Sequence, residues 1–172
     1  MRFNEVARRT GHIACVLTIA VILAACARQS PKEYGSANGL GSAGAATPGS
    51  SQDFSQNVGD TVHFLTDATD LTPQAQNILR NQARWLNQYP QYSITLEGHA
   101  DERGTREYNI ALGSRRATTV RNFLAQQGVN PARMRTISYG KERPVAVCDN
   151  ISCWSQNRRV KTNLNTRAMA QR

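Results

Sequence analysis

The chain has 172 residues, which is enough for one domain of ordinary size plus an additional segment, and it carries a formal net charge of +9. Without its first 25 residues it keeps 18 basic and 11 acidic residues, a net charge of +7. This balance favours anionic partners but does not choose among them. Aromatic residues make up only 6% and are not interleaved with the basic ones, so we expect no nucleic-acid partner.

Residues 1–25 have the features of a targeting segment. Arginines near the start precede an apolar stretch over residues 13–23, which is too short to span a bilayer as a stable helix and fits a secretory signal. The segment ends Leu23-Ala24-Ala25-Cys26, which resembles a bacterial lipobox. We therefore expect Cys26 to carry the acyl chains of a lipoprotein. A plain signal peptide followed by a chance cysteine is the alternative.

The next segment differs sharply in composition. After Cys26, residues 26–57 are dominated by Gly, Ser, Ala, Asn and Gln and show no apolar period, which predicts a flexible, disordered linker. We expect a folded domain over residues 58–166 and a C-terminal tail over residues 167–172.

Within the expected domain, the hydrophobic period alternates between that of strands and that of helices. We expect strands at residues 61–65, 93–98, 135–139 and 159–164, and helices at residues 73–89 and 107–127. Strands interleaved with helices on one face predict a two-layer α/β sandwich.

The second helix places a charge among apolar residues. Arg116 follows Leu112 by four residues and precedes Val120 by four, so its guanidinium lies on the apolar face and needs an anion or a route to solvent. We expect Asp101, in the turn before the helix, to be its partner, with Asn109 two turns up the same face. This cluster indicates either a recognition site for a ligand with both charges or a purely structural salt bridge.

The mature part of the chain holds two further cysteines and two histidines. Cys148 and Cys153 are separated by four residues and are expected to form a disulfide in an oxidising compartment. A metal site would need more ligands than His63 and His99 supply, so we expect no metal. His99 is expected to be a hydrogen-bonded structural residue.

Three motifs identify a family. The chain contains Gly98-His99-Ala100-Asp101, then Asn109-Ile110-Ala111-Leu112-Gly113-Ser114-Arg115-Arg116-Ala117, then Asn157-Arg158-Arg159. Together they closely resemble the OmpA-like peptidoglycan-binding domain over about residues 58–166. The resemblance implies an α/β (α+β) two-layer sandwich of βαβαβ-β order with a mixed four-stranded sheet.

The resemblance also implies a ligand, the meso-diaminopimelate of the peptidoglycan stem peptide. Asp101 is then expected to bind its ammonium and Arg116 its carboxylate, and Asn109 and the 102–105 turn, including Glu102, are expected to add contacts. Asp67 matches the aspartate of a family segment after the first strand, and Arg158 is a weaker candidate. Some relatives have a second carboxylate in that segment where this chain has Leu65.

The implied function is non-catalytic, without a cofactor: an outer-membrane lipoprotein with its domain in the periplasm, which holds the membrane to the cell wall. TolB-like and other Tol proteins, and a role in cell division, follow from the resemblance alone. A lipoprotein of the same family that binds the wall without the Tol proteins is an alternative. A wall-cleaving enzyme is the other class, but Asp101 and Glu102 are adjacent, and no activated nucleophile accompanies them.

Overall fold

The computed structural model describes residues 46–166. Its elements, in chain order, are α2 (Ser51–Asp53), the π-helix η2 (Phe54–Gly59), β1 (Thr61–His63), α3 (Pro73–Gln88), β2 (Tyr92–His99), α4 (Arg106–Gln126), the 3₁₀-helix η3 (Pro131–Arg133), β3 (Met134–Gly140), α5 (Ile151–Asn157) and β4 (Arg159–Thr166). The expected strands and helices are all present, although β1 ends at His63, two residues earlier than expected, and the chain turns at residues 66–67.

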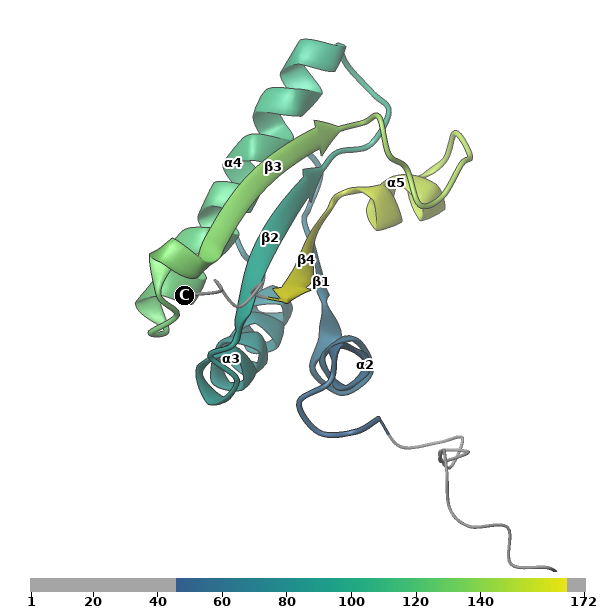
Figure 1. Cartoon of the computed structure of the whole chain (residues 1–172). Coiled ribbons are helices and arrows are strands. Elements are labelled where there is room, and N and C mark those ends of the chain that lie inside the picture. The colour runs from purple at the N-terminus through teal and green to yellow at the C-terminus, as the bar shows by residue number, and fades with distance from the viewer. Residues whose placement is uncertain (1–45, 167–172) are drawn as a thin grey trace, which may run out of the picture. The chain divides into compact units, whose positions relative to one another are not determined.

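The four strands form one mixed sheet in the order β1-β4-β2-β3. Strand β4 is antiparallel to both β1 and β2, whereas β2 and β3 are parallel, with Ile94 opposite Met134. Helix α4 packs on β2 and β3, and α3 contacts β1 and α4, so both long helices cover the same face (Figure 1). The expected two-layer sandwich with a mixed four-stranded sheet is confirmed.

The core lies between the sheet and these two helices. Strand β2 alternates accordingly, because Ile94 and Leu96 are buried whereas Thr95 and Glu97 face the opposite, uncovered side. Helix α3 begins at Pro73 with Thr72 as its N-cap, and α4 begins after the N-cap Thr105. The apolar residues that fill the core from the helices include Leu79, Leu86, Ala117, Val120 and Leu124.

Two glycines allow α4 to lie unusually close to β2. A Cβ atom at Gly98 would be 1.9 Å from the carbonyl oxygen of Gly113, and one at Gly113 would be 2.4 Å from the Ser138 hydroxyl. Any larger side chain at Gly98 would therefore push the helix away from the strand. This close contact sets the position of the turn between β2 and α4.

The folded part of the chain begins earlier than the sequence indicates. Residues 46–57, expected to be the end of the flexible linker, include a short helical segment, and Phe54 is 1% exposed with its ring 4.9 Å from that of Trp85. The Asp53 carboxylate accepts hydrogen bonds from Trp85 Nε1 and the Gly49 amide. Sparse apolar residues in a Gly- and Ser-rich stretch gave no period from which this docking could be predicted.

The expected signal segment, lipidated Cys26, most of the expected linker and the expected tail lie outside the described residues. Over residues 46–166, no helix is both long and apolar enough to cross a bilayer.

Candidate functional site

A pocket of about 240 Å³ opens where the turn between β2 and α4 meets the loop between β1 and α3. We call it the β2–α4 pocket. It is lined by Thr66, Asp67, Asp101, Arg103, Gly104, Tyr108, Asn109, Leu112 and Arg116. Four of the predicted site residues are thus brought together although they are as far as 49 positions apart in the sequence: Asp67, Asp101, Asn109 and Arg116.

Asp101 is the most heavily bonded carboxylate of the pocket. Its Oδ2 accepts from Arg103 Nη2 at 2.8 Å and Arg158 Nη1 at 3.2 Å, while its Oδ1 accepts from the Arg103 backbone amide at 3.3 Å and Nε at 3.2 Å. Burial opposes ionisation, but the hydrogen bonds from Arg103 and Arg158 outweigh it and keep the pKa of Asp101 below its ordinary value. Asp101 is therefore a carboxylate at neutral pH and a poor general acid.

Arg116 does not bind Asp101, contrary to the expectation from sequence. Within residues 46–166, its Nε donates to Ala68 O at 2.8 Å, its Nη1 to His99 O at 2.9 Å and its Nη2 to Leu65 O at 3.1 Å. Burial and the nearby Arg158 charge lower its pKa to about 10, so it stays protonated at neutral pH. The fully buried guanidinium thereby ties the loop after β1 to α4 and β2 through backbone carbonyls.

The other two predicted residues shape the mouth and floor of the pocket. Asp67 has a left-handed backbone (φ 55°), and its carboxylate accepts a hydrogen bond from the Tyr108 hydroxyl, which raises the pKa of Tyr108. Asn109 is buried and its Nδ2 donates to the carbonyls of Arg103 at 2.7 Å and Thr105 at 3.0 Å. The amide side chain thus holds the turn that carries Asp101.

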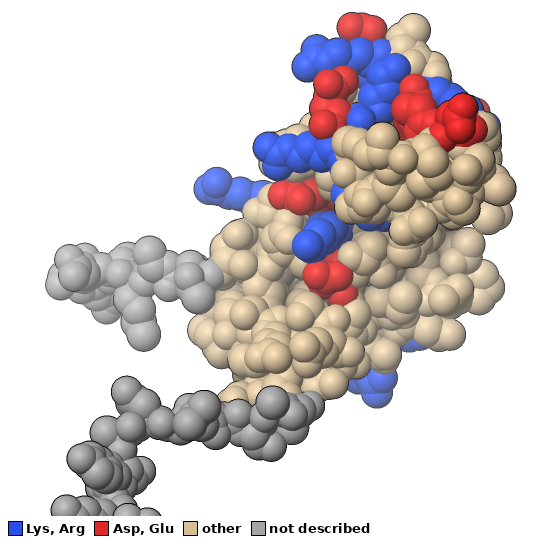
Figure 2. Space-filling model, turned by 90° about the vertical axis from the view of Figure 1, so that its right-hand side faces the viewer, with Lys and Arg blue, Asp and Glu red and all other residues tan. Residues whose placement is uncertain are grey.

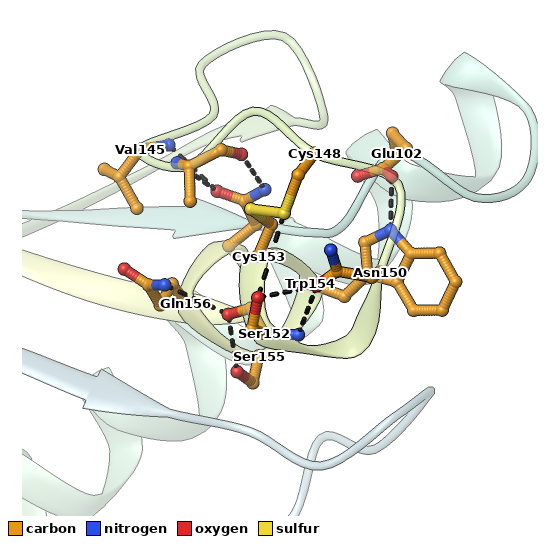
Figure 3. Close-up of a disulfide and its surroundings, with 11 residues drawn as sticks. Glu102, Val145, Cys148, Asn150, Ser152, Cys153, Trp154, Ser155 and Gln156 are labelled. Atoms are coloured by element: carbon orange, nitrogen blue, oxygen red, sulfur yellow. Dashed lines mark hydrogen bonds between the residues drawn. A yellow bond between two sulfur atoms is a disulfide. The ribbon is translucent and has the colours of Figure 1, made fainter.

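Two predicted residues lie beside the pocket instead of in its wall. Arg158 is buried against Asp101 and also donates from Nε to Phe64 O at 3.1 Å, so it supports the carboxylate from behind. Glu102 turns away, and its carboxylate accepts from the indole of Trp154. Trp154 belongs to α5, next to the disulfide that joins Cys148 and Cys153, as expected (Figure 3).

The expectation for His99 is wrong in one respect. The residue is buried, but neither ring nitrogen has a hydrogen-bond partner among the described residues; Nε2 lies 3.9 Å from Glu97 Oε2. Burial and the charges of Arg159, Arg143 and Lys161 lower the pKa of His99 to about 4, so the ring is neutral at neutral pH. Over the described part of the chain, no group of three or more potential ligands is placed to hold a metal ion.

Three residues of the site were not assigned to it from the sequence. Arg103 stands two positions after Asp101 in an exposed turn and binds its carboxylate. This short spacing from Asp101 was the one signal in the sequence that could have indicated the contact. Tyr108 stands four residues before Leu112, a spacing that places it on the apolar face of α4, yet it is 43% exposed and lines the pocket. Trp154 lies in a helix without an apolar period, so no pattern indicated its role.

Figure 2 shows charges of both signs concentrated in the upper part of one face and continuing to its middle, whereas the lower part of that face is largely uncharged. The pocket has the same mixed character, since Asp67 and Asp101 face Arg103 and Arg116. This arrangement suits a ligand with both an ammonium and a carboxylate better than a polyanion.

Comparison with known proteins identifies the family. The model of the OmpA family matches residues 63–158, which include the whole pocket. The chain belongs to the OmpA family. Full-length relatives named peptidoglycan-associated lipoprotein are 59% identical in Agrobacterium fabrum, over 96% of this chain and 93% of the relative, and 58% identical in Brucella melitensis, over 95% and 96%.

The OmpA-family fold is also found in solved structures. One is the crystal structure of the peptidoglycan-associated lipoprotein from Burkholderia pseudomallei, whose sequence is 42% identical. The match covers 62% of this chain and 90% of the Burkholderia chain, with a TM-score of 0.60. The resemblance found in the sequence motifs is therefore confirmed. These OmpA-family relatives are named for association with peptidoglycan and not for a reaction, in agreement with a non-enzymatic protein.

Proposed function

We propose that the domain binds peptidoglycan non-covalently by taking the free end of meso-diaminopimelate into the β2–α4 pocket. The observation that carries this proposal is the pocket itself, in which two carboxylates and two guanidinium groups surround a space of about 240 Å³. The free end of diaminopimelate is an amino acid, with an ammonium and a carboxylate on one carbon. A pocket lined by both signs of charge is complementary to both groups.

Asp67 and Asp101 are the groups for the ammonium. Asp101 is only 7% exposed and already accepts from two arginines, so a bound ammonium shares or replaces one of these contacts. Asp67 is exposed at the mouth, where its carboxylate meets the Tyr108 hydroxyl. A ligand entering the pocket therefore meets Asp67 first.

Arg116 is the group for the carboxylate. Three of its five N–H groups go to carbonyls of described residues, which leaves one on each Nη for a ligand. Because its side chain is fully buried, a ligand reaches it only after the Asp67–Tyr108 hydrogen bond or the 65–68 loop shifts. We infer that binding includes such a local opening.

We further propose that the chain is a lipoprotein of the cell envelope with a periplasmic domain, as the names of its relatives suggest. Lipidation at Cys26 and anchoring in the outer membrane rest on the lipobox-like sequence, which gives two or three acyl chains and hence a stable anchor. Together with wall binding, this would attach the outer membrane to the cell wall. The same proposal includes an interaction with TolB-like and other Tol proteins and a role in cell division.

Sedimentation of a soluble form, residues 27–172, with insoluble peptidoglycan tests the proposal. We expect the parent to sediment with diaminopimelate-containing wall but weakly with wall that has lysine in its place, since lysine keeps the ammonium and lacks the carboxylate. Asp101→Asn should lose affinity by about 30-fold, because it removes a charged partner from a partly desolvated site.

Asp70→Asn is the matched control, since Asp70 is an exposed carboxylate of the same β1–α3 loop outside the pocket. Equal sedimentation of the parent and the folded Asp101→Asn variant would refute the assignment of the site. No binding of the parent to either wall would refute the proposed function.

A further inference from the structure

Trp154 contacts the binding turn without lining the pocket. The guanidinium carbon of Arg103 lies 4.2 Å from the centre of its indole ring, a cation–π contact, and the indole Nε1 donates to the Glu102 carboxylate. Figure 3 shows this indole reaching from α5 toward Glu102. One aromatic side chain thus touches two successive residues of the turn that follows Asp101.

Through Arg103 this contact reaches the pocket. The Arg103 side chain is 43% exposed, and a free arginine of that exposure would sample many rotamers. Here its Nε and Nη2 bind the two oxygens of Asp101 while its flat face rests on the indole. The stacking limits Arg103 to the rotamer that holds the Asp101 carboxylate in place.

The position of Trp154 is in turn fixed by its own segment. Helix α5 has only seven residues, too few to be stable alone, but Asn150 caps its N-terminus by accepting from the Ser152 amide at 3.0 Å. The Cys148–Cys153 disulfide ties the helix to the preceding loop (Figure 3). Asn157 fixes the other end through hydrogen bonds with the backbone of Val145 and Ala146.

Resting on the proposed binding of the stem peptide in the β2–α4 pocket, we propose that Trp154 is a positioning residue for that site. It acts by stacking on Arg103, which holds the Asp101 carboxylate, and the Cys148–Cys153 disulfide braces α5 so that the stack persists. Segment 148–157, which contains the disulfide and α5, is therefore part of the binding apparatus although it does not line the pocket.

The test measures affinity for a soluble, diaminopimelate-containing muropeptide by titration calorimetry on residues 27–172. Trp154→Ala should weaken binding by about 3- to 30-fold, the range expected for loss of a cation–π contact. Trp154→Phe keeps a ring for Arg103 but lacks the N–H group, and it should stay within about threefold of the parent. Gln156→Ala, an exposed change on the same helix, is the control and should bind like the parent.

The disulfide is tested separately. Dithiothreitol, which supplies the two electrons that convert the disulfide into two thiols, should weaken binding by the parent. It should have no effect on the Cys148→Ser/Cys153→Ser double variant, which should already bind like the reduced parent. The Nε–H signal of Arg103 in NMR spectra should shift between the parent and Trp154→Ala, while the backbone spectrum of the variant remains that of a folded protein.

Two results would overturn the inference and leave the proposed function intact. One is Trp154→Ala binding like the parent while Asp101→Asn shows its expected loss of affinity. The other is weaker binding by Trp154→Ala with an unchanged Arg103 signal. Unchanged binding by the reduced parent would exclude the disulfide as the brace. A parent that binds no muropeptide would refute the proposed function and this inference with it.

Discussion

Replacing Arg116 by lysine tests what the buried guanidinium contributes to the fold. Lysine keeps the positive charge, but a single ammonium cannot reach the carbonyls of Leu65, Ala68 and His99 together, because three different nitrogens of the planar guanidinium bind them. Hydrogen bonds from a charged donor contribute about 1.5–3 kcal/mol each, and a lysine that recovers some of them leaves the others unmade. We expect Arg116→Lys to lower the free energy of unfolding by about 2–4 kcal/mol.

The measurement is urea unfolding of residues 27–172 followed by circular dichroism, with the free energy extrapolated to water. Arg115→Lys is the matched control, since Arg115 is the exposed neighbour on α4, and it should change stability by less than about 0.5 kcal/mol. If the two variants were equally stable, Arg116 would not hold the β1–α3 loop as the contacts indicate. Because this loss of stability accompanies any loss of binding, Asp101→Asn is the better probe of the ligand.

The remaining predictions concern pH, packing and anchoring. Because the pKa of His99 is about 4 in the folded protein and 6.5 in the unfolded chain, the unfolded chain binds more protons between these two pH values. The free energy of unfolding should therefore fall by about 3 kcal/mol as the pH drops from 6.5 towards about 4. His99→Gln should lack this part of the pH dependence in unfolding experiments, and an unchanged profile would contradict it. Gly98→Ala forces a Cβ atom against Gly113 O, so it should lower the free energy of unfolding by more than about 3 kcal/mol or prevent folding. Denaturation of the purified variant measures this loss. Cys26→Ser should leave the membrane fraction or accumulate unprocessed, and normal maturation into the outer membrane would exclude the lipoprotein assignment.

The sequence by itself determined the family and the order of the four strands and the two long helices, whereas the short helix α5 had no pattern that predicted it. Local signals were sufficient, because Pro73 marks the start of α3, and Ile94 and Leu96 alternate with polar residues in β2. Motif spacing also selected Asp101, Asn109 and Arg116, which the fold brings to one pocket.

The tertiary structure decided which groups contact one another. Arg116 was paired with Asp101 from helical spacing, but the carbonyls that satisfy it come from the β1–α3 loop and β2, and no spacing within α4 encodes their approach. The docking of Phe54 on Trp85 and of Trp154 on Arg103 likewise joins distant segments, and the segments that carry Phe54 and Trp154 have no apolar period. Periodicity describes which face of an element is buried, whereas the partner of a polar group depends on where the rest of the chain places its acceptors.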